Sequence, residues 1–317
     1  CNLETTFAGG QYTGYPVFNA PESLASALKK AGFDVALTAN NHTMDMGISG
    51  MKRTLEIARE EGLETAGTHL AGEKDYTILT VKNVKIGIVA YLYETPVIDS
   101  IPTVNGNEIS DDAWPLLNTF RYDKLDEDLQ KVKKSIQNAR DDGADIVICY
   151  FHWGEEYQRT PNEYQQYIAK EAASYGADVI FASHPHVIQG MEMIIDAATG
   201  KEVPVFYSMG NFISNQRTET IDNRYTEQGI IAQVQLEYMK SSKQVLSVRV
   251  DAVPIWVEKY KKGGKDIYTI IPLDDTLKEN PSLAESGHLS RAEQALADIK
   301  DLLGEEYITR LNDPPPR

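Results

Sequence analysis

Cysteine, long apolar runs and basic charge are all scarce in this sequence of 317 residues. The two cysteines are Cys1 and Cys149, and the second lies in the apolar run DIVICYF, where we expect a small buried hydrophobic residue. A framework of disulfides is therefore excluded as the basis of the fold. No segment approaches the roughly 18 to 20 uninterrupted apolar residues of a membrane span, so the chain is expected to be soluble.

Acidic residues outnumber basic ones, with 47 Asp and Glu against 31 Lys and Arg, which gives a formal net charge of −16. Such a chain repels the backbone of nucleic acid unless a local basic patch intervenes, and the basic runs are as short as Lys261-Lys262. We therefore expect no nucleic acid among its partners. The content of 42% hydrophobic and 25% charged residues is typical of a globular protein with a sizeable core.

A unit of helix, glycine, any residue, aspartate and apolar strand occurs three times in the sequence. Apolar residues at helical spacing predict helices over residues 20–32, 124–143 and 163–176. A glycine ends each helix, and the strands that follow are FDVALTA, ADIVICYF and ADVIFAS. The glycines are Gly32, Gly143 and Gly176. A histidine follows each glycine eight to ten residues later, which indicates repeated architecture.

Continuous apolar strands that follow helices predict a largely parallel sheet with helices on its faces. Ligands of such sheets gather outside the carboxyl ends of the strands, so His42, His152 and His184 are expected to meet at one edge. Because His184 precedes Pro185, its backbone is expected to be extended. An extended backbone would let His184 and His186 present their rings on the same side.

The remaining segments complete an α/β fold. Residues 82–94 predict another buried strand, and residues 47–62 predict a helix after the first histidine loop. Further along, VFYSMGNF, GIIAQVQLEY, KQVLSVRVDAVPIWV and IYTIIPL alternate in polarity and predict an antiparallel second sheet packed on the first. The expected architecture is a four-layer αββα sandwich over residues 1–275. Residues 276–317 are expected to form a helical C-terminal extension and the tail NDPPPR.

Four of the six histidines lie in the strand-end loops, with Asn40 and Asn41 beside the first of them. One such histidine alone would be a hydrogen-bonded loop residue, but four at one sheet edge indicate a metal or phosphate site. With Glu4 added, the set contains imidazole, amide and carboxylate groups and no thiolate. This set suits Mn²⁺, Fe or Zn²⁺ in an open catalytic site and argues against a closed structural zinc site.

Five motifs follow one another over residues 2–216: NLETTF, ANNHTMDMG, FHWGEEY, SHPHVIQGME and YSMGNFISNQ. In this order they resemble the motif series of the CapA family, the bacterial proteins of poly-γ-glutamate capsule synthesis. That family is similar in fold to the calcineurin-like metallophosphoesterases, whose sandwich holds two metal ions. The resemblance therefore implies a metallophosphoesterase-type sandwich, and its motifs leave residues 217–317 uncovered.

The resemblance also implies a site of two divalent metal ions, Mn, Fe or Zn, and assigns its ligands. The implied metal ligands are Glu4, Asn41, His152, His184 and His186. Glu4 would take the place of the acidic bridging ligand, and Asn41 that of the amide-oxygen ligand. His42 would be the catalytic residue, a non-ligand acid or charge stabiliser beside the substrate.

Further positions are expected in the cleft or around the ligands, and they are Asn40, Asp45, Glu155, Gln189 and Asn211. Glu155, together with Glu156 and Tyr157, either orients His152 or contacts substrate, or else forms a solvated acidic turn. Asn211 either lines the cleft or belongs to an ordinary turn.

Three more assignments rest on local sequence alone. Asp45 is expected to cap the helix that begins near Gly47, with orientation of His42 as the alternative. His69 and His288 lie in polar surroundings without an evident partner. Both are therefore expected to be surface residues.

The start of the sequence departs from the family pattern. The family begins with a strand that carries a Gly-Asp motif and an early Asp ligand, whereas this sequence opens at Cys1, directly before NLE. The chain as given thus lacks the first strand, so either an upstream segment is omitted or the metal site is incomplete. We expect an upstream segment, since a missing central strand would expose a long apolar edge. The resemblance implies an extracytoplasmic protein that is membrane-anchored through such a segment.

Two functions follow from the resemblance as alternatives. In the first, a protein of poly-γ-glutamate capsule biosynthesis carries a metal-dependent, phosphoesterase-like hydrolase site in which metal-activated water attacks the substrate. In the second, a non-catalytic component uses the same cleft to hold polyglutamate during export. The acidic surface disfavours a free polyanion, so the second function would require metal-bridged binding. The implied partners are polyglutamate or a phosphorylated small substrate, and membrane-bound capsule synthesis subunits.

Overall fold

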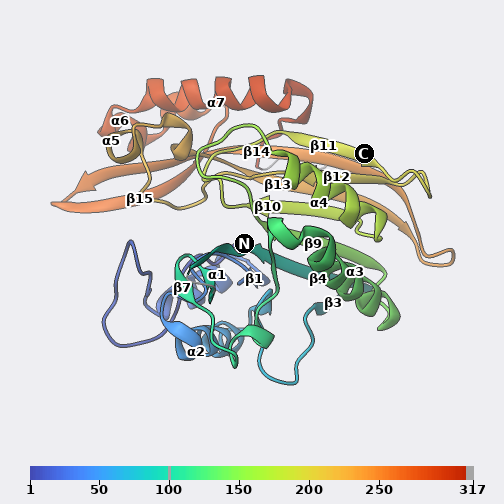
Figure 1. Ribbon diagram of the computed structural model, residues 1–317. Helices are drawn as coiled ribbons and strands as arrows, with labels where there is room; N and C mark the ends of the chain where they lie inside the picture. The colour runs from blue at the N-terminus through green and yellow to red at the C-terminus, as the bar shows by residue number, and fades with distance from the viewer. Residues whose placement is uncertain (99–100, 312–317) are drawn as a thin grey trace. The chain divides into compact units, whose positions relative to one another are not determined.

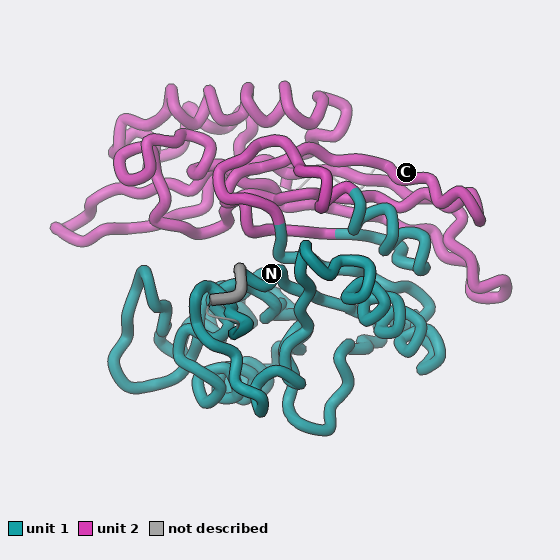
Figure 2. Tube along the Cα trace, viewed as in Figure 1, with its two compact units in different colours: residues 1–153, 167–180 teal, residues 154–166, 181–317 magenta. Residues whose placement is uncertain are grey.

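The structure is a computed structural model that describes residues 1–98 and 101–311 (Figure 1). Its contacts divide the chain into two compact units (Figure 2). Unit 1 holds residues 1–153 and 167–180, and unit 2 holds residues 154–166 and the chain from residue 181 onward. Each unit combines helices with β-sheet, which confirms the predicted α/β class and is consistent with an α/β sandwich.

Unit 1 is organised around strand β4, which pairs in parallel with β9 and β8 and antiparallel with β3. Its helices are α1 (Ser23–Lys30), α2 (Gly47–Glu60) and α3 (Leu125–Asp141). Its strands are β1 (Val35–Leu37), β2 (Glu64–Ala66), β3 (Thr77–Val81), β4 (Val84–Tyr93), β5 (Thr95–Ile98), β6 (Ile101–Val104), β7 (Asn107–Glu108), β8 (Thr119–Phe120) and β9 (Ile146–His152). Helix α4 (Glu163–Ser174) and strand β10 (Val179–Ser183) run across the division between the units.

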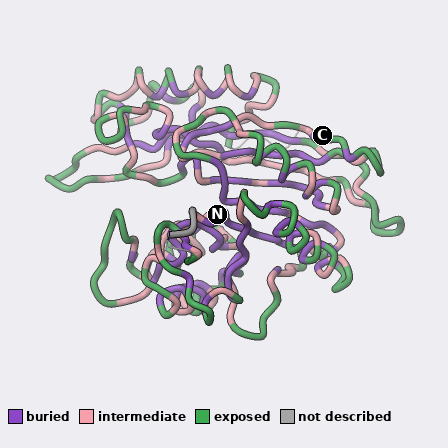
Figure 3. The backbone as a smooth tube through the Cα atoms, in the orientation of Figure 1, coloured by how far each residue is buried: buried purple, intermediate pink, exposed green. Residues whose placement is uncertain are grey.

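Helix α3 packs on β4 in unit 1 through an apolar stripe at helical spacing. Leu129, Val132 and Ile136 are almost completely buried in that stripe, as the sequence pattern predicts. Burying each such side chain contributes about 1.5–3 kcal/mol relative to leaving it in water. The predicted buried strand over residues 82–94 is confirmed as β4, whose second half is buried (Figure 3).

The recurring Gly-x-Asp unit has a structural cause. Gly32, Gly143 and Gly176 all have positive φ, between 93° and 108°, which ends each helix in a conformation that glycine adopts without strain. In the second and third copies the aspartate then binds the neighbouring strand: the carboxylate of Asp145 accepts from the Lys85 N–H at 2.8 Å. The carboxylate of Asp178 accepts from the Val147 N–H at 2.6 Å in the same way. In these two copies the repeat therefore fixes where the strand begins.

Unit 2 contains the antiparallel sheet β13-β14-β15 and the antiparallel pair β11-β12. Its strands are β11 (Met191–Ile195), β12 (Glu202–Phe206), β13 (Gln228–Met239), β14 (Gln244–Lys262) and β15 (Lys265–Pro272), and its helices are α5 (Thr218–Ile221), α6 (Pro281–Ser286) and α7 (Leu289–Leu303). The predicted antiparallel sheet is confirmed for its last three strands. The segment VFYSMGNF, which was expected in the same sheet, is placed differently. Its first two residues are the end of β12, and β12 pairs with β11.

Helix α7 lies along the sheet of unit 2 (Figure 1) and shares one hydrophobic core with it. Trp256 from β14 and Ile271 from β15 meet Ala295 and Ile299 of α7 in this core. The predicted helix near residues 288–303 is thus confirmed. The domain boundary after residue 275 stays a prediction, and the last six residues of the predicted tail lie outside the described part of the chain.

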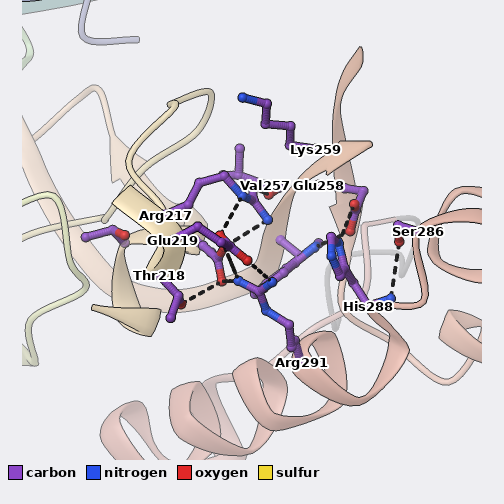
Figure 4. Close-up of polar contacts among 12 residues, drawn as sticks. Arg217, Thr218, Glu219, Val257, Glu258, Lys259, Ser286, His288 and Arg291 are labelled. Carbon is purple, nitrogen blue, oxygen red and sulfur yellow. Dashed lines mark hydrogen bonds and ion pairs between the residues drawn. The ribbon is translucent and has the colours of Figure 1, made fainter. Parts of the chain in front are cut away.

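An ion-pair network connects α7 to the segment before β13 (Figure 4). The fully buried carboxylate of Glu227 accepts from Arg291 at 2.6 Å and lies 2.8 Å from a guanidinium nitrogen of Arg217. Burial raises the pKa of Glu227, and the two guanidinium groups oppose that rise. Arg291 also pairs with Glu219 and lowers the pKa of that carboxyl to about 2. The network fixes α7 on the sheet.

Two further observations bear on the predicted architecture. Strand β1 pairs with β2 in a two-stranded parallel sheet of its own, so the first histidine loop does not follow a strand of the β4 sheet. The expectation of one shared sheet edge is wrong for that loop. Among the described residues, no helix has both the length and the apolar character needed to cross a lipid bilayer.

Candidate functional site

The loop after β1 holds a histidine and an aspartate in direct contact. His42 Nδ1 lies 2.7 Å from Asp45 Oδ2, and the same carboxylate oxygen accepts from the Phe18 N–H at 2.7 Å. Both side chains are buried, and the Phe18 ring meets the His42 ring edge-on with centroids 4.5 Å apart. The expected helix cap at Asp45 is wrong, because Met46 is the N-cap residue of α2 and has no side-chain cap. The alternative assignment, orientation of His42, is the one the contacts support.

Asn40 fixes the same loop to the start of the chain. Its amide donates to the Leu3 carbonyl at 2.8 Å and to Asn2 Oδ1 at 3.1 Å, and its own Oδ1 accepts from the His42 N–H. Asn2 in turn donates to Glu4 Oε2 at 2.8 Å. Glu4 is therefore tied to the histidine loop through two asparagine side chains, and Asn40 has a positioning role.

His152 ends β9 and contacts the asparagine that precedes His42. His152 Nε2 lies 3.0 Å from Asn41 Oδ1, and His152 Nδ1 lies 3.3 Å from the hydroxyl of Tyr150. All three side chains are buried. Unit 1 thus brings together His152 and the loop of residues 40–45, which are far apart in the sequence. Tyr150 was missed by the sequence analysis, although its position two residues before His152 puts both on one face of the strand.

In unit 2, His184 and His186 lie on either side of Pro185 with their ring centroids 6.2 Å apart. The predicted extended backbone is wrong: φ is +108° at His184 and +58° at His186. Few residues other than glycine adopt this region, and such strain is concentrated at functional sites. The rings come close together through this strained turn, and an extended strand is not involved.

Asn211 holds His186 from the opposite side of the turn. Its Oδ1 lies 3.0 Å from His186 Nδ1, and its amide donates to the carbonyls of His186 and Thr226. Two glycines make this placement possible. A Cβ at Gly229 would lie 2.1 Å from the Asn211 carbonyl oxygen, and one at Gly210 would lie 2.5 Å from the Gln228 carbonyl oxygen. Asn211 thus contacts His186 within unit 2, and its expected place in a substrate cleft stays a prediction.

The other expected neighbours have simpler surroundings. Gln189 is buried and donates to the backbone carbonyls of Gln158 and Thr160, so it connects two loops of unit 2. Glu155 is exposed, and Glu156 Oε1 lies 4.0 Å from His186 Nε2. The role of Glu155 therefore stays a prediction.

The two histidines expected at the surface are both partly buried. His288 Nδ1 lies 2.8 Å from the buried carboxylate of Glu258 (Figure 4), so the expectation that it has no partner is wrong. Burial lowers the pKa of His69, and its Nδ1 is buried without a hydrogen-bond partner among the residues that the structure describes. Contacts between segments far apart in the sequence bury these two side chains, and local sequence does not reveal such contacts.

Glu94, which follows the last residue of β4, was also missed by the sequence analysis. It is 1% exposed, and within the described ranges neither carboxylate oxygen has a hydrogen-bond partner. The nearest cation is Arg121, whose Nε lies 3.8 Å away. Burial raises the pKa of Glu94, and the charge of Arg121 opposes the rise.

The donor groups fit a metal ion in part. Ligands at right angles around a cation at about 2.1 Å lie about 3 Å apart, which is the separation of Asn41 Oδ1 and His152 Nε2. Among described residues, however, no three His, Cys, Asp or Glu side chains form a group that would hold a metal ion. The chemistry of the donors, imidazole and amide oxygen, suits Mn, Fe or Zn. The complete set of five ligands stays a prediction.

Comparison with known families places these residues in context. The sequence profile described as "Bacterial capsule synthesis protein PGA_cap" matches residues 1–216, which include all the strand-end histidines. The chain belongs to this family. The resemblance seen in the motifs is confirmed, and a metallophosphoesterase-like fold is consistent with PGA_cap membership.

Individual relatives of this PGA_cap chain agree with the profile. "Capsule biosynthesis protein CapA" of Bacillus anthracis is 34% identical over 200 residues, and "PGA biosynthesis protein CapA" of Bacillus subtilis (strain 168) is 33% identical over 190. These alignments cover 62% and 60% of this chain and 44% of each relative, so the chain spans less than half their length. "Uncharacterized protein y4sH" of Sinorhizobium fredii is 24% identical over 258 residues, with 64% of this chain and 53% of the relative covered.

Proposed function

We propose that this chain acts in poly-γ-glutamate capsule synthesis and that its strand-end residues form a phosphoesterase-like hydrolytic site. The capsule role is supported by PGA_cap membership and by two relatives whose names state capsule or PGA biosynthesis. The hydrolytic role is supported chiefly by one observation. A single loop presents both the buried His42–Asp45 contact and the Asn41–His152 contact.

In this proposal His42 exchanges a proton with the substrate. Asp45 accepts from Nδ1 of the ring, which fixes the tautomer and leaves Nε2 as the nitrogen that exchanges the proton. The Phe18 ring and the buried carboxylate hold the imidazole in one orientation. His42 would then protonate or stabilise the leaving oxygen of a phosphoryl group, and an oriented imidazole is suited to that role.

Asn41, His152, Glu4, His184 and His186 would hold the two divalent cations that the family implies. Bound there, the cations would supply a water of lowered pKa and positive charge opposite the phosphoryl oxygens. Asn211 and Tyr150 contact the Nδ1 atoms of His186 and His152, which leaves Nε2 of each ring as the ligating position. Membrane-bound capsule synthesis subunits belong to the proposal as partners.

The test is hydrolysis of a generic aryl phosphate by the protein with added Mn²⁺. We expect turnover that the chelator EDTA abolishes and that His42→Asn lowers by about 100-fold or more, the usual contribution of a general acid. No turnover by the metal-loaded protein would count against a hydrolase. Isothermal titration with polyglutamate would then separate the alternative: metal-dependent binding without turnover supports a binding component of export.

A further inference from the structure

The loop that follows the HWG motif is fixed to the His-x-His loop within unit 2. The Tyr157 N–H donates to the Pro185 carbonyl at 2.8 Å. The side chain of Gln189 donates to the carbonyls of Gln158 at 2.9 Å and Thr160 at 3.3 Å. The residue between those two carbonyls is therefore held by the backbone on both sides.

That residue is Arg159, whose half-buried guanidinium lies over the Tyr225 ring, 4.0 Å from its centroid. Its hydrogen bond is a long one, 3.5 Å from Nη2 to the Asp298 carbonyl. Across residues 1–98 and 101–311, no carboxylate forms an ion pair with Arg159. A guanidinium stacked on an aromatic ring keeps the N–H groups at its edge available for an oxyanion.

Arg224 provides the contrast, because its guanidinium lies over the same Tyr225 ring at 4.5 Å. Its Nε and Nη2 donate to the two carboxylate oxygens of Asp298 at 3.0 and 2.9 Å. The positive charge of Arg224 is thus balanced by the carboxylate of Asp298, whereas no carboxylate of the described residues balances the charge of Arg159. The two residues share one ring and differ in whether they are free to take a ligand.

We propose that Arg159 binds an oxyanion of the substrate, a carboxylate or a phosphate, next to the His-x-His turn. The inference rests on the proposed function, because it takes that turn to be part of the site. Tyr157, two residues earlier, stacks on His186 with ring centroids 6.3 Å apart, so Arg159 belongs to the same clamped segment. In a chain of net charge −16, an anion needs such a local cation.

Acidic neighbours increase the dependence of oxyanion binding on Arg159. Glu155 and Glu156 are exposed on the same loop, and they repel an approaching oxyanion. Without Arg159 the remaining local charge of this loop is negative. Loss of the guanidinium therefore removes the attractive charge and leaves the repulsive ones, so its effect exceeds that of one neutral hydrogen bond.

The experiment compares Arg159→Gln with the matched variant Arg224→Gln by isothermal titration at low ionic strength, with EDTA present so that no cation bridges the ligand. Tri-γ-glutamate and inorganic phosphate are the two probes. We expect Arg159→Gln to weaken binding of at least one probe about 10- to 100-fold, the usual effect of losing a charge-assisted hydrogen bond. Arg224→Gln should lower the melting temperature and leave binding within about twofold. Arg159→Lys keeps the charge without the planar fork and should fall between.

The probe whose binding is lost identifies the source of the oxyanion, polymer carboxylate or phosphate ester. Equal weakening by both variants would overturn the proposal, and so would wild-type protein that binds neither probe. The outcome is independent of catalysis. Arg159-dependent binding without hydrolysis of an aryl phosphate would leave the anion site standing while the hydrolytic function fails.

Discussion

The two histidine-bearing regions hold their imidazoles by different means. In unit 1, His42 and His152 lie on ordinary backbone, and side chains orient them: a carboxylate for the first, a hydroxyl and an amide for the second. In unit 2, His184 and His186 are placed by a turn with positive φ, and Asn211 supports the second ring. Unit 1 therefore relies on buried polar partners to hold its histidines. Unit 2 relies on backbone geometry, including the close approach of chain segments that Gly210 and Gly229 permit beside Asn211.

The largest expected effect tests the backbone side of this comparison. Gly229→Ala would place a Cβ against the Asn211 carbonyl oxygen, and neither backbone can yield easily. We expect the free energy of unfolding to fall by about 3 kcal/mol, at the upper end of typical overpacking costs. Urea denaturation measures it. The control is Gly190→Ala, where a Cβ has no neighbour within 4 Å, with an expected change within about 0.5 kcal/mol. Equal stability of the two variants would contradict the role given to Gly229.

The next effect tests the side-chain support in unit 1. Asp45→Ala removes a buried carboxylate that accepts from His42 and from the Phe18 N–H, and should cost about 2 kcal/mol. Thermal or urea unfolding provides the measurement. Asp34→Ala is the matched control, because that side chain is 81% exposed and its pair with Lys29 is worth little. A loss at Asp45 no greater than at Asp34 would argue that the contact with His42 is incidental.

Strain in the His-x-His turn predicts a smaller effect of opposite sign. His184→Gly replaces a side chain at φ +108° by the residue that adopts this region freely. In the presence of chelator we expect the variant to be more stable than the wild type by about 1 kcal/mol. His152→Gly, on regular strand backbone and buried, should instead be destabilised. If both substitutions destabilise alike, the proposed difference between the regions is wrong.

The smallest effect is a pH dependence that belongs to unit 1. Burial lowers the pKa of His69 below its usual 6.5, so the unfolded chain takes up this proton at a higher pH than the folded protein. The unfolding free energy should therefore decrease as the pH falls below about 6.5. His69→Gln should make that decrease shallower, as measured by urea midpoints between pH 7 and pH 5. A slope identical to the wild type would exclude His69 as its source.

Sequence alone predicts the strands that carry the histidines because local rules suffice there. A positive-φ glycine ends each helix, and in two of the three copies the aspartate accepts from the neighbouring strand, so the repeats are recognisable without tertiary information. The antiparallel sheet of unit 2 is predictable from alternation in the same way. These rules place Asn41 and His152 at strand ends, where their side chains meet.

Other features depend on contacts that local rules miss. The rule for residues before proline favours extended backbone, yet tertiary structure holds His184 in a left-handed conformation. Asp45 has the residue type and the position expected of a helix cap. It instead contacts His42 and Phe18, the latter 27 residues away. The contact between His288 and Glu258 joins the start of α7 to β14. Neither segment has a local sequence pattern that predicts it.

The most direct test of the central claim is the metal content of purified protein. The comparison is between the wild type, the double variant Asn41→Ala/His152→Ala from unit 1 and the double variant His184→Ala/His186→Ala from unit 2. If both histidine regions contribute ligands, elemental analysis should find Mn, Fe or Zn in the wild type and a clear loss in each double variant. Metal content that is the same in all three proteins would contradict a metal site at these residues.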